Sequence, residues 1–329
     1  MRAERLTAFA VAALAVVCIA GCQRHSKSEA YDLIVMNSSL PYWQTVTAGF
    51  NKAAAEYGVT AKVDGPDHYD PKEELADFQK AVAAKPAGIL VAVSDASVLG
   101  DAITSAVNAG VPVITVDSDA VNSRRLFFIG TNNLEAGRLG GRRIAEKLGG
   151  KGNVVIYSIT GQPNIEERVK GLKDALANSP GIKIVDVVDI KTNELIAFDK
   201  TQMYMAQTGD KKINGFVCLD SACGKVVADA ISRSGAKDRV LVAWDVVPDT
   251  LNEIKSGVID ATVAQKPYSM GYVGLKELDM VFHDPPKPLD QNWSADSFSH
   301  FPVFVDTGTA IVDKTNVDAY LADAARMNQ

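Results

Sequence analysis

The chain has 329 residues, which is long for one small module and suggests about two domains. It is 47% hydrophobic and 22% charged, which excludes a disordered or collagen-like chain. The formal net charge of −6, without a basic stripe, argues against nucleic-acid binding. No zinc-type His or Cys spacing joins the four histidines, so no metal site is expected among His25, His68, His283 and His300.

The first 21 residues are predicted to be an export signal. Two arginines precede an apolar run from Ala8 to Ala20, which is too short for a comfortable membrane span. The run ends in Ile-Ala-Gly-Cys22, which resembles a bacterial lipobox, where cleavage precedes a cysteine whose thiol is acylated. A plain secretory signal with a chance cysteine is the alternative. We expect an exported protein with residues 22–30 as a tether and the lipid on Cys22 as its membrane attachment.

Apolar strands alternate with helices from residue 31 onward. Tyr31–Met36 reads as a strand, and apolar residues from Trp43 to Tyr57 recur at three- and four-residue steps on one helix face that Gly58 ends. The first series continues with strands 59–63, 87–93 and 111–116 and helices near 75–82 and 98–108. A second series has helices 134–148, 165–177, 199–208 and 223–234 and strands 153–159, 182–189, 214–219 and 239–244.

These strands are continuously apolar, as parallel strands are when helices cover both faces of a sheet. Regular alternation of strands and helices predicts an α/β protein with doubly wound sheets. Two series predict two such lobes with a cleft between them. Ligands of open α/β sheets bind beyond the carboxyl ends of the strands, so the residues that follow each strand are candidates for the site.

The candidate residues share a hydrogen-bonding and stacking chemistry. Carboxylates accept hydrogen bonds from hydroxyl groups, an arginine offers a fork of donors, and aromatic rings cover the C–H faces of a sugar. The set contains no histidine and no nucleophile with a base, so we expect neither an enzyme nor a cofactor. The residues are Asn37, Tyr42, Trp43, Asp117, Ser118, Arg168, Asp220, Asp245 and Gln265.

Several segments in order resemble the periplasmic sugar-binding proteins of the ribose/galactose type, the substrate-binding components of ABC importers. They include PYWQTVTAGFNKAAAEYG, GVPVITVDSDA and FIGTNNLEAGRLGG, then ERVKGLKDAL and VLVAWDVVPDTLNEIKSGVIDATVAQKPYSMG. The resemblance covers about residues 31–320. It implies a type I periplasmic binding protein fold, with three hinge crossings near 131–132, 264–265 and 305–306. The lobes are then 31–131 with 265–305, and 132–264 with 306–329.

The resemblance also implies roles for individual residues. Tyr42 and Trp43 would sandwich a sugar ring, Asp117, Arg168 and Asp245 would bond its hydroxyls, and Gln265 would bond it at a crossing. Asn37 and Asp220 stand where the family places polar contacts. Ribose binders have an arginine, an asparagine and an asparagine at the positions of Ser118, Leu40 and Asp220, so the resemblance leaves the particular sugar open. Phe198 is a candidate for an aromatic contact from the second lobe, and Trp244 is expected to pack.

Simpler structural roles stay open for the same residues. Tyr42 and Trp43 can open an amphipathic helix as core residues, and the two strand-end aspartates can cap the segments that follow them. Arg168 can pair with Glu166 or Glu167 on a surface, and Gln265 can act in the hinge alone.

For Cys218 and Cys223 we expect buried thiols, with a disulfide as the alternative, because one ends a strand and the other opens a helix.

The leading functional hypothesis is a monomeric lipid-anchored receptor that binds a small neutral sugar or polyol and delivers it to an ABC permease. A receptor that presents the ligand to a sensor kinase or chemoreceptor is the main alternative. A LacI-type repressor shares the core, but an export signal occupies the place of its DNA-binding segment. The lack of a nucleophile–base pair argues against a hydrolase.

Overall fold

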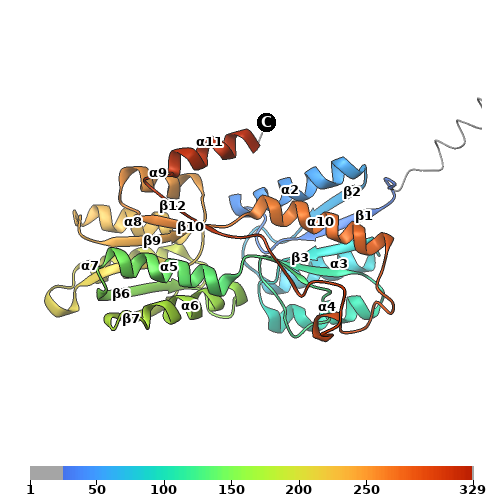
Figure 1. Ribbon diagram of the computed structural model, residues 1–329, viewed down its shortest axis with the longest axis horizontal. Coiled ribbons are helices and arrows are strands. Elements are labelled where there is room, and N and C mark those ends of the chain that lie inside the picture. Colours follow the sequence, from blue (N-terminus) through green and yellow to red (C-terminus); the bar gives the residue numbers. More distant parts are fainter. Residues whose placement is uncertain (1–24, 328–329) are drawn as a thin grey trace, which may run out of the picture.

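The computed structural model describes residues 25–327, so the expected export signal and Cys22 lie outside the described residues. Two six-stranded sheets, each covered by helices, form two lobes side by side (Figure 1). We call the unit built on the sheet that contains β1 the first lobe, and the unit built on the sheet that contains β6 the second lobe. The predicted α/β architecture is confirmed.

The first lobe has a fully parallel sheet in the order β11-β5-β4-β3-β1-β2. Separate hydrophobic clusters lie on its two faces, with α2 and α10 packed on one and α3 and α4 on the other. Its strands are β1 (Ala30–Ile34), β2 (Thr60–Asp64), β3 (Gly88–Val91), β4 (Val113–Val116), β5 (Phe128–Gly130) and β11 (Phe304–Asp306). Its helices are α2 (Pro41–Tyr57), α3 (Pro71–Ala83), α4 (Ala96–Asn108), α10 (Pro267–His283) and a 3-10 turn, η2 (Trp293–Ala295).

The second lobe repeats this plan in the order β12-β10-β9-β8-β6-β7, with only β12 antiparallel to its neighbour. The strands are β6 (Lys151–Ser158), β7 (Gly181–Asp189), β8 (Ile213–Cys218), β9 (Val240–Trp244), β10 (Ala261–Ala264) and β12 (Ala310–Asp313). The helices are α5 (Asn133–Lys147), α6 (Pro163–Leu176), α7 (Glu194–Met205), α8 (Cys223–Arg233), α9 (Pro248–Ser256), α11 (Val317–Met327) and a 3-10 turn, η1 (Gly209–Lys211).

The chain passes between the two sheets three times. Residues 131–132 connect β5 to α5, residues 265–266 connect β10 to α10, and residues 307–309 connect β11 to β12. The third passage was expected at 305–306, but those residues pair with β5 as the end of β11. At the passages, Thr131 Oγ1 donates to Gln265 Oε1 at 2.8 Å, and the backbone N–H of Asn132 donates to Asp306 Oδ1 at 3.3 Å.

Glycines let α5 and α6 pack with their backbones in close contact. A Cβ added to Gly137 would lie 2.2 Å from the Arg168 carbonyl oxygen, and one added to Gly171 would lie 1.9 Å from that of Leu134. No side chain fits at such distances, so only glycine permits this crossing. The contact holds α6, and with it Arg168, against the first helix after the hinge.

No helix within residues 25–327 is long and apolar enough to cross a membrane.

Candidate ligand-binding site

A cavity of about 180 Å³ lies between the lobes at the carboxyl ends of their strands. Both lobes and the second hinge passage contribute to its walls. Eight of the nine expected contact residues are among those that line it. The lining residues are Met36, Asn37, Leu40, Tyr42, Trp43, Tyr69, Asp117, Ile159, Gln162, Asn164, Ile165, Arg168, Thr192, Glu194, Asp220, Ser221, Ala222, Asp245 and Gln265.

Asp117 and Asp245 occupy matching positions in the two lobes. Asp117 follows β4 and Asp245 follows β9, and both have left-handed backbones, with φ of 63° and 64°. Their amides donate to the carbonyls of Ile129 and Val263 in the adjacent strands, at 3.0 and 2.9 Å. Aspartate tolerates this conformation better than most residues, and strained backbones of this kind gather at functional sites. Each lobe thus presents a strand-end carboxylate to the cavity from a matching position.

Both oxygens of Asp117 already have donors. The Tyr42 hydroxyl donates to Oδ1 at 2.5 Å, and Nδ2 of Asn164 donates to Oδ2 at 2.9 Å. Tyr42 belongs to the first lobe, whereas Asn164 lies at the start of α6 in the second lobe. The Asn164 contact therefore bridges the cleft directly.

Arg168 is 2% exposed, and protein acceptors hold its guanidinium in place. Its Nε donates to Asn133 Oδ1 at 2.8 Å, its Nη1 to the Leu219 carbonyl at 2.8 Å, and its Nη2 to Gln265 Oε1 at 3.0 Å. The guanidinium carbon lies 5.4 Å from the centroid of the Trp244 ring. Arg168 is therefore a positioned cation at the cavity wall, and the surface pairing with Glu166 or Glu167 does not occur.

Gln265 connects the hinge to the site. Its Oε1 accepts from Thr131 and Arg168, and its Nε2 donates to Asp245 Oδ1 at 2.8 Å. Since residues 131 and 265 belong to two different passages between the lobes, this one side chain joins both passages to the cavity. Any rotation at the hinge changes the surroundings of Gln265.

The cavity wall holds two buried carboxylates, Asp117 and Asp245, and the half-buried Asp220 around one guanidinium. Burial raises the pKa of Asp245 to about 7 and that of Asp220 to about 6, and it also raises the pKa of Asp117. The Arg168 charge opposes each of these shifts. Donors that reach these oxygens would favour the ionised form and replace the lost water.

The loop after β8, which carries Asp220, is closed by a disulfide between Cys218 and Cys223. The Cα atoms of the two cysteines lie 5.6 Å apart, within the range that a disulfide requires. The expectation of two thiols is wrong because the loop folds back on itself between the strand and the helix. The Cys223 amide donates to Asp220 Oδ1 at 3.1 Å, so the closed loop also orients this carboxylate.

The two adjacent aromatic residues line the cavity in a different way from the expected sandwich. The ring centroids of Tyr42 and Trp43 lie 5.2 Å apart with an interplanar angle of 84°. A sugar ring does not fit between two perpendicular rings at this distance. Tyr69, from the loop before α3, adds a third aromatic side chain to the wall.

Three other residues lie away from the cavity wall. Ser118 is buried, is not a lining residue, and its hydroxyl has no hydrogen-bond partner within residues 25–327. Phe198 lies beneath the Arg233 guanidinium at 5.0 Å and does not reach the cavity. Trp244 packs behind Arg168, as expected.

Sequence reasoning missed several lining residues. Asn164 is the most important of them, since it forms the contact across the cleft. The signal that pointed to Arg168 applies to it too, because it lies in the first turn of α6, the helix that follows the strand β6. Three others, Tyr69, Thr192 and Glu194, come from longer connections. There, distance from the end of a strand does not predict which residue reaches the cavity.

The fold and the inter-lobe cavity define a two-lobed solute-binding protein. The chain belongs to the family defined by the periplasmic binding protein domain, whose model matches residues 31–282. It is 26% identical over 259 residues to the ribose import binding protein RbsB of Escherichia coli (strain K12), covering 76% of this chain and 83% of that protein. Family membership implies an extracytoplasmic location.

Solved structures agree with this assignment. GanP, a glucose-galactose binding protein from Geobacillus stearothermophilus, matches with a TM-score of 0.79 and 28% identity, over 88% of this chain and 98% of that one. A solute-binding protein of an ABC transporter from Burkholderia graminis C4D1M, in complex with D-arabinose, matches with a TM-score of 0.80 and 25% identity, over 89% and 98%. The expected family and fold are confirmed.

Proposed function

We propose that the chain binds one small neutral sugar or polyol in the inter-lobe cavity and delivers it to an ABC permease. The observation that carries the proposal is the meeting of Asp117, Arg168 and Asp245 around one cavity from both lobes. Buried carboxylates need donors, and adjacent hydroxyl groups supply them without bringing a further buried charge. A neutral polyhydroxyl ligand therefore suits this wall better than an anion.

The relatives support the class of ligand. The names of similar proteins specify ribose, glucose and galactose, and one similar structure contains D-arabinose. A cavity of about 180 Å³ suits a single small molecule. We infer direct contacts from Asn37, Trp43, Asp117, Arg168, Asp220, Asp245 and Gln265, to which the geometry adds Asn164.

The finer features of the receptor belong to the same proposal. Export with cleavage before Cys22 and acylation of that cysteine would hold a monomer at the cell envelope. The lobes would close around the ligand by rotation at the three passages, and a permease would recognise the closed face. Binding and release, without catalysis, account for all the groups at the site.

A ligand panel tests the proposal. We expect one monosaccharide or polyol to raise the melting temperature of the purified chain, since a ligand at a hundred times its Kd stabilises by about 2.7 kcal/mol. Calorimetry then gives the affinity and a stoichiometry of one. Amino acids and sugar acids serve as the comparison set. Binding of a member of that set, with none among the neutral sugars and polyols, would reject the proposed ligand class.

A further inference from the structure

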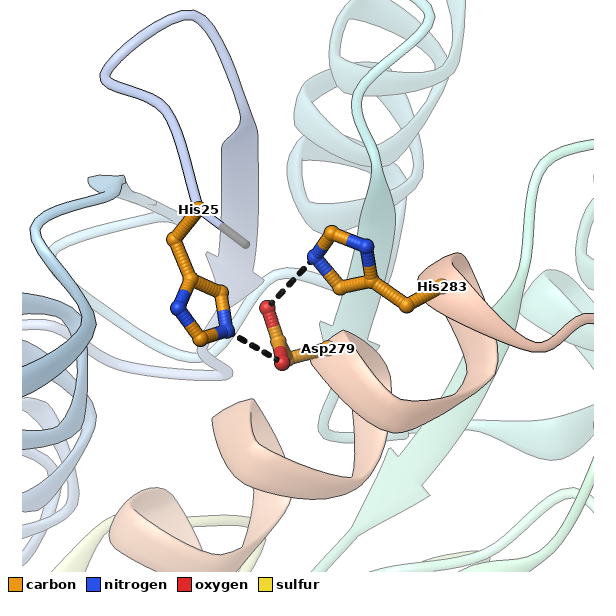
Figure 2. Close-up of side chains that lie close together, drawn as sticks. All are labelled: His25, Asp279 and His283. Carbon is orange, nitrogen blue, oxygen red and sulfur yellow. Dashed lines mark hydrogen bonds and ion pairs between the residues drawn. The ribbon is translucent and has the colours of Figure 1, made fainter. Parts of the chain in front are cut away.

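Two histidines and two carboxylates meet on the first lobe, outside the sugar cavity. Figure 2 shows His25, from the segment before β1, facing Asp279 and His283, which lie one turn apart near the end of α10. Asp279 is twelve residues beyond the start of α10, about 18 Å along the helix axis from the hinge end. None of these residues lines the sugar cavity.

The distances between the donor atoms suit one small cation. His25 Nε2 lies 3.0 Å from Asp279 Oδ2, and His283 Nε2 lies 3.5 Å from Asp279 Oδ1. One ligand atom from each of these three residues lies within 4.8 Å of the other two, and Glu29 Oε2 lies beside the group, 3.3 Å from His283 Nε2. In a tetrahedral zinc site with bonds of about 2.1 Å, neighbouring ligand atoms lie about 3.4 Å apart.

Two of these atoms are buried without a hydrogen-bond partner. Glu29 Oε2 and His283 Nε2 have no such partner anywhere within residues 25–327. A cation bound by the ring nitrogen satisfies that atom and places a positive charge beside the acceptor oxygen. Asp279 is 3% exposed, so its charge also lies away from water.

Neighbouring groups orient the ligands. The Tyr31 hydroxyl donates to Asp279 Oδ1 at 3.0 Å, and the His25 ring stacks on Tyr57 with centroids 4.5 Å apart and an interplanar angle of 6°. Metal sites use such outer hydrogen bonds and packing to fix the direction of their ligands.

We propose that His25, Asp279 and His283 bind one Zn²⁺ ion beside the carboxylate of Glu29. Two neutral imidazoles and one carboxylate match the nitrogen and oxygen ligands of a three-residue zinc site, and the ion compensates the buried negative charge of Asp279. Bound there, it fastens the chain that leads to β1 onto α10 and so fixes the direction in which the tether leaves the first lobe. His25 lies three residues after Cys22, beyond the expected cleavage point, and so remains in the expected exported chain.

Zinc titration tests the site. We expect the purified full chain to take one equivalent of Zn²⁺ in competition with a chromogenic chelator, and to give the intense visible spectrum of tetrahedral Co²⁺ when cobalt replaces it. Outer-shell changes weaken metal sites by 10- to 100-fold, which is the loss expected for Tyr31→Phe, and His25→Ala and His283→Ala should lose more than about 100-fold. His300→Ala, at an exposed histidine, is the matched control and should bind as the unchanged chain does.

His25→Ala is the decisive variant because His25 precedes β1 and its loss leaves both sheets intact. Sugar affinity, measured on the same samples, should be unchanged in each variant, which separates this proposal from the proposed function. A full chain that takes up no zinc, or zinc affinity that survives in either histidine variant, overturns the proposed site.

Discussion

The amide of Asn164 on the second lobe donates to the carboxylate of Asp117 on the first lobe, with 2.9 Å between Nδ2 and Oδ2. The other oxygen of Asp117 accepts from Tyr42. A first-lobe carboxylate that follows β4 is therefore held by one donor from each lobe. The contact requires the two lobes to lie as close together as they do here, so it links their relative position to one hydrogen bond in the site.

Removing this contact should weaken ligand binding. In Asn164→Ala the closed form loses a charge-assisted hydrogen bond across the lobes, worth about 1.5–3 kcal/mol, and affinity for the ligand found in the panel should fall roughly 10- to 150-fold. Isothermal titration calorimetry measures the change. Asn51→Ala, at an exposed position on α2, is the matched control.

Small-angle scattering gives the second readout for the same variant. The unchanged chain should contract when the ligand binds, because only a closed cleft lets both lobes touch it. Without its ligand, Asn164→Ala should have a radius of gyration at least as large as that of the unchanged chain. Tight binding by a demonstrably open form, with no contraction, would refute closure by hinge rotation.

The two strand-end aspartates should each be essential for affinity. Asp117→Ala or Asp245→Ala removes a buried acceptor of hydroxyl groups, at a cost of roughly 2–4 kcal/mol, or about 30- to 1000-fold in Kd. Asp101→Ala, on the exposed face of α4, should leave the affinity unchanged. Unaltered calorimetric affinity in both cavity variants would remove the proposed site.

The stability of the ligand-free protein should fall as the pH rises from about 4 to about 7. Burial raises the pKa of Asp245 to about 7 and that of Asp220 to about 6, from an ordinary value of 3.8. The folded state therefore keeps protons that the unfolded chain has already lost in this window, and that stabilisation disappears as the folded groups ionise. Urea unfolding at several pH values between 4 and 8 measures the slope.

Asp245→Asn identifies the source of that slope. The amide keeps an oxygen for Gln265 but cannot ionise, so the pH dependence between 5 and 8 should become shallower. Asp249→Asn, at an exposed position on α9, is the control and should keep the slope of the unchanged chain. An equal slope in all three proteins would show that the buried carboxylate does not titrate as expected.

Opening the disulfide should affect the site more than the fold. Cys218 and Cys223 close a loop of only a few residues, for which the chain-entropy estimate is about 2 kcal/mol of stability. Because the same loop carries Asp220, the double variant Cys218→Ser/Cys223→Ser should bind the ligand several-fold more weakly while remaining folded. Mass spectrometry of the unreduced chain should find it two hydrogens lighter than the reduced chain, and equal masses would contradict the bridge.

Membrane attachment should depend on Cys22. Cys22→Ser removes the thiol that would be acylated, and the protein should then be released in a folded form that still binds its ligand. Fractionation followed by a salt wash measures this. A variant that stays with the membranes after the wash would contradict the lipid anchor.

The sequence alone determined the alternation of strands and helices from β1 to β9, except for β5, and the strand-end residues Asp117 and Asp245. Continuous apolar runs identify buried parallel strands. In this topology, the polar side chains that directly follow such a run lie at the cleft. That rule depends only on local order along the chain. It therefore succeeded for eight of the nine expected contact residues, which line the cavity.

Tertiary structure alone decided which side chains meet. Asn164 reaches Asp117 only because the two lobes face each other across the cavity, and Cys218 meets Cys223 only because the loop between them folds back. His25 and His283 come from opposite ends of the chain, so no sequence spacing could join them. Such contacts depend on how the chain crosses between lobes and where α10 packs, and these are properties of the assembled cores that no local pattern encodes.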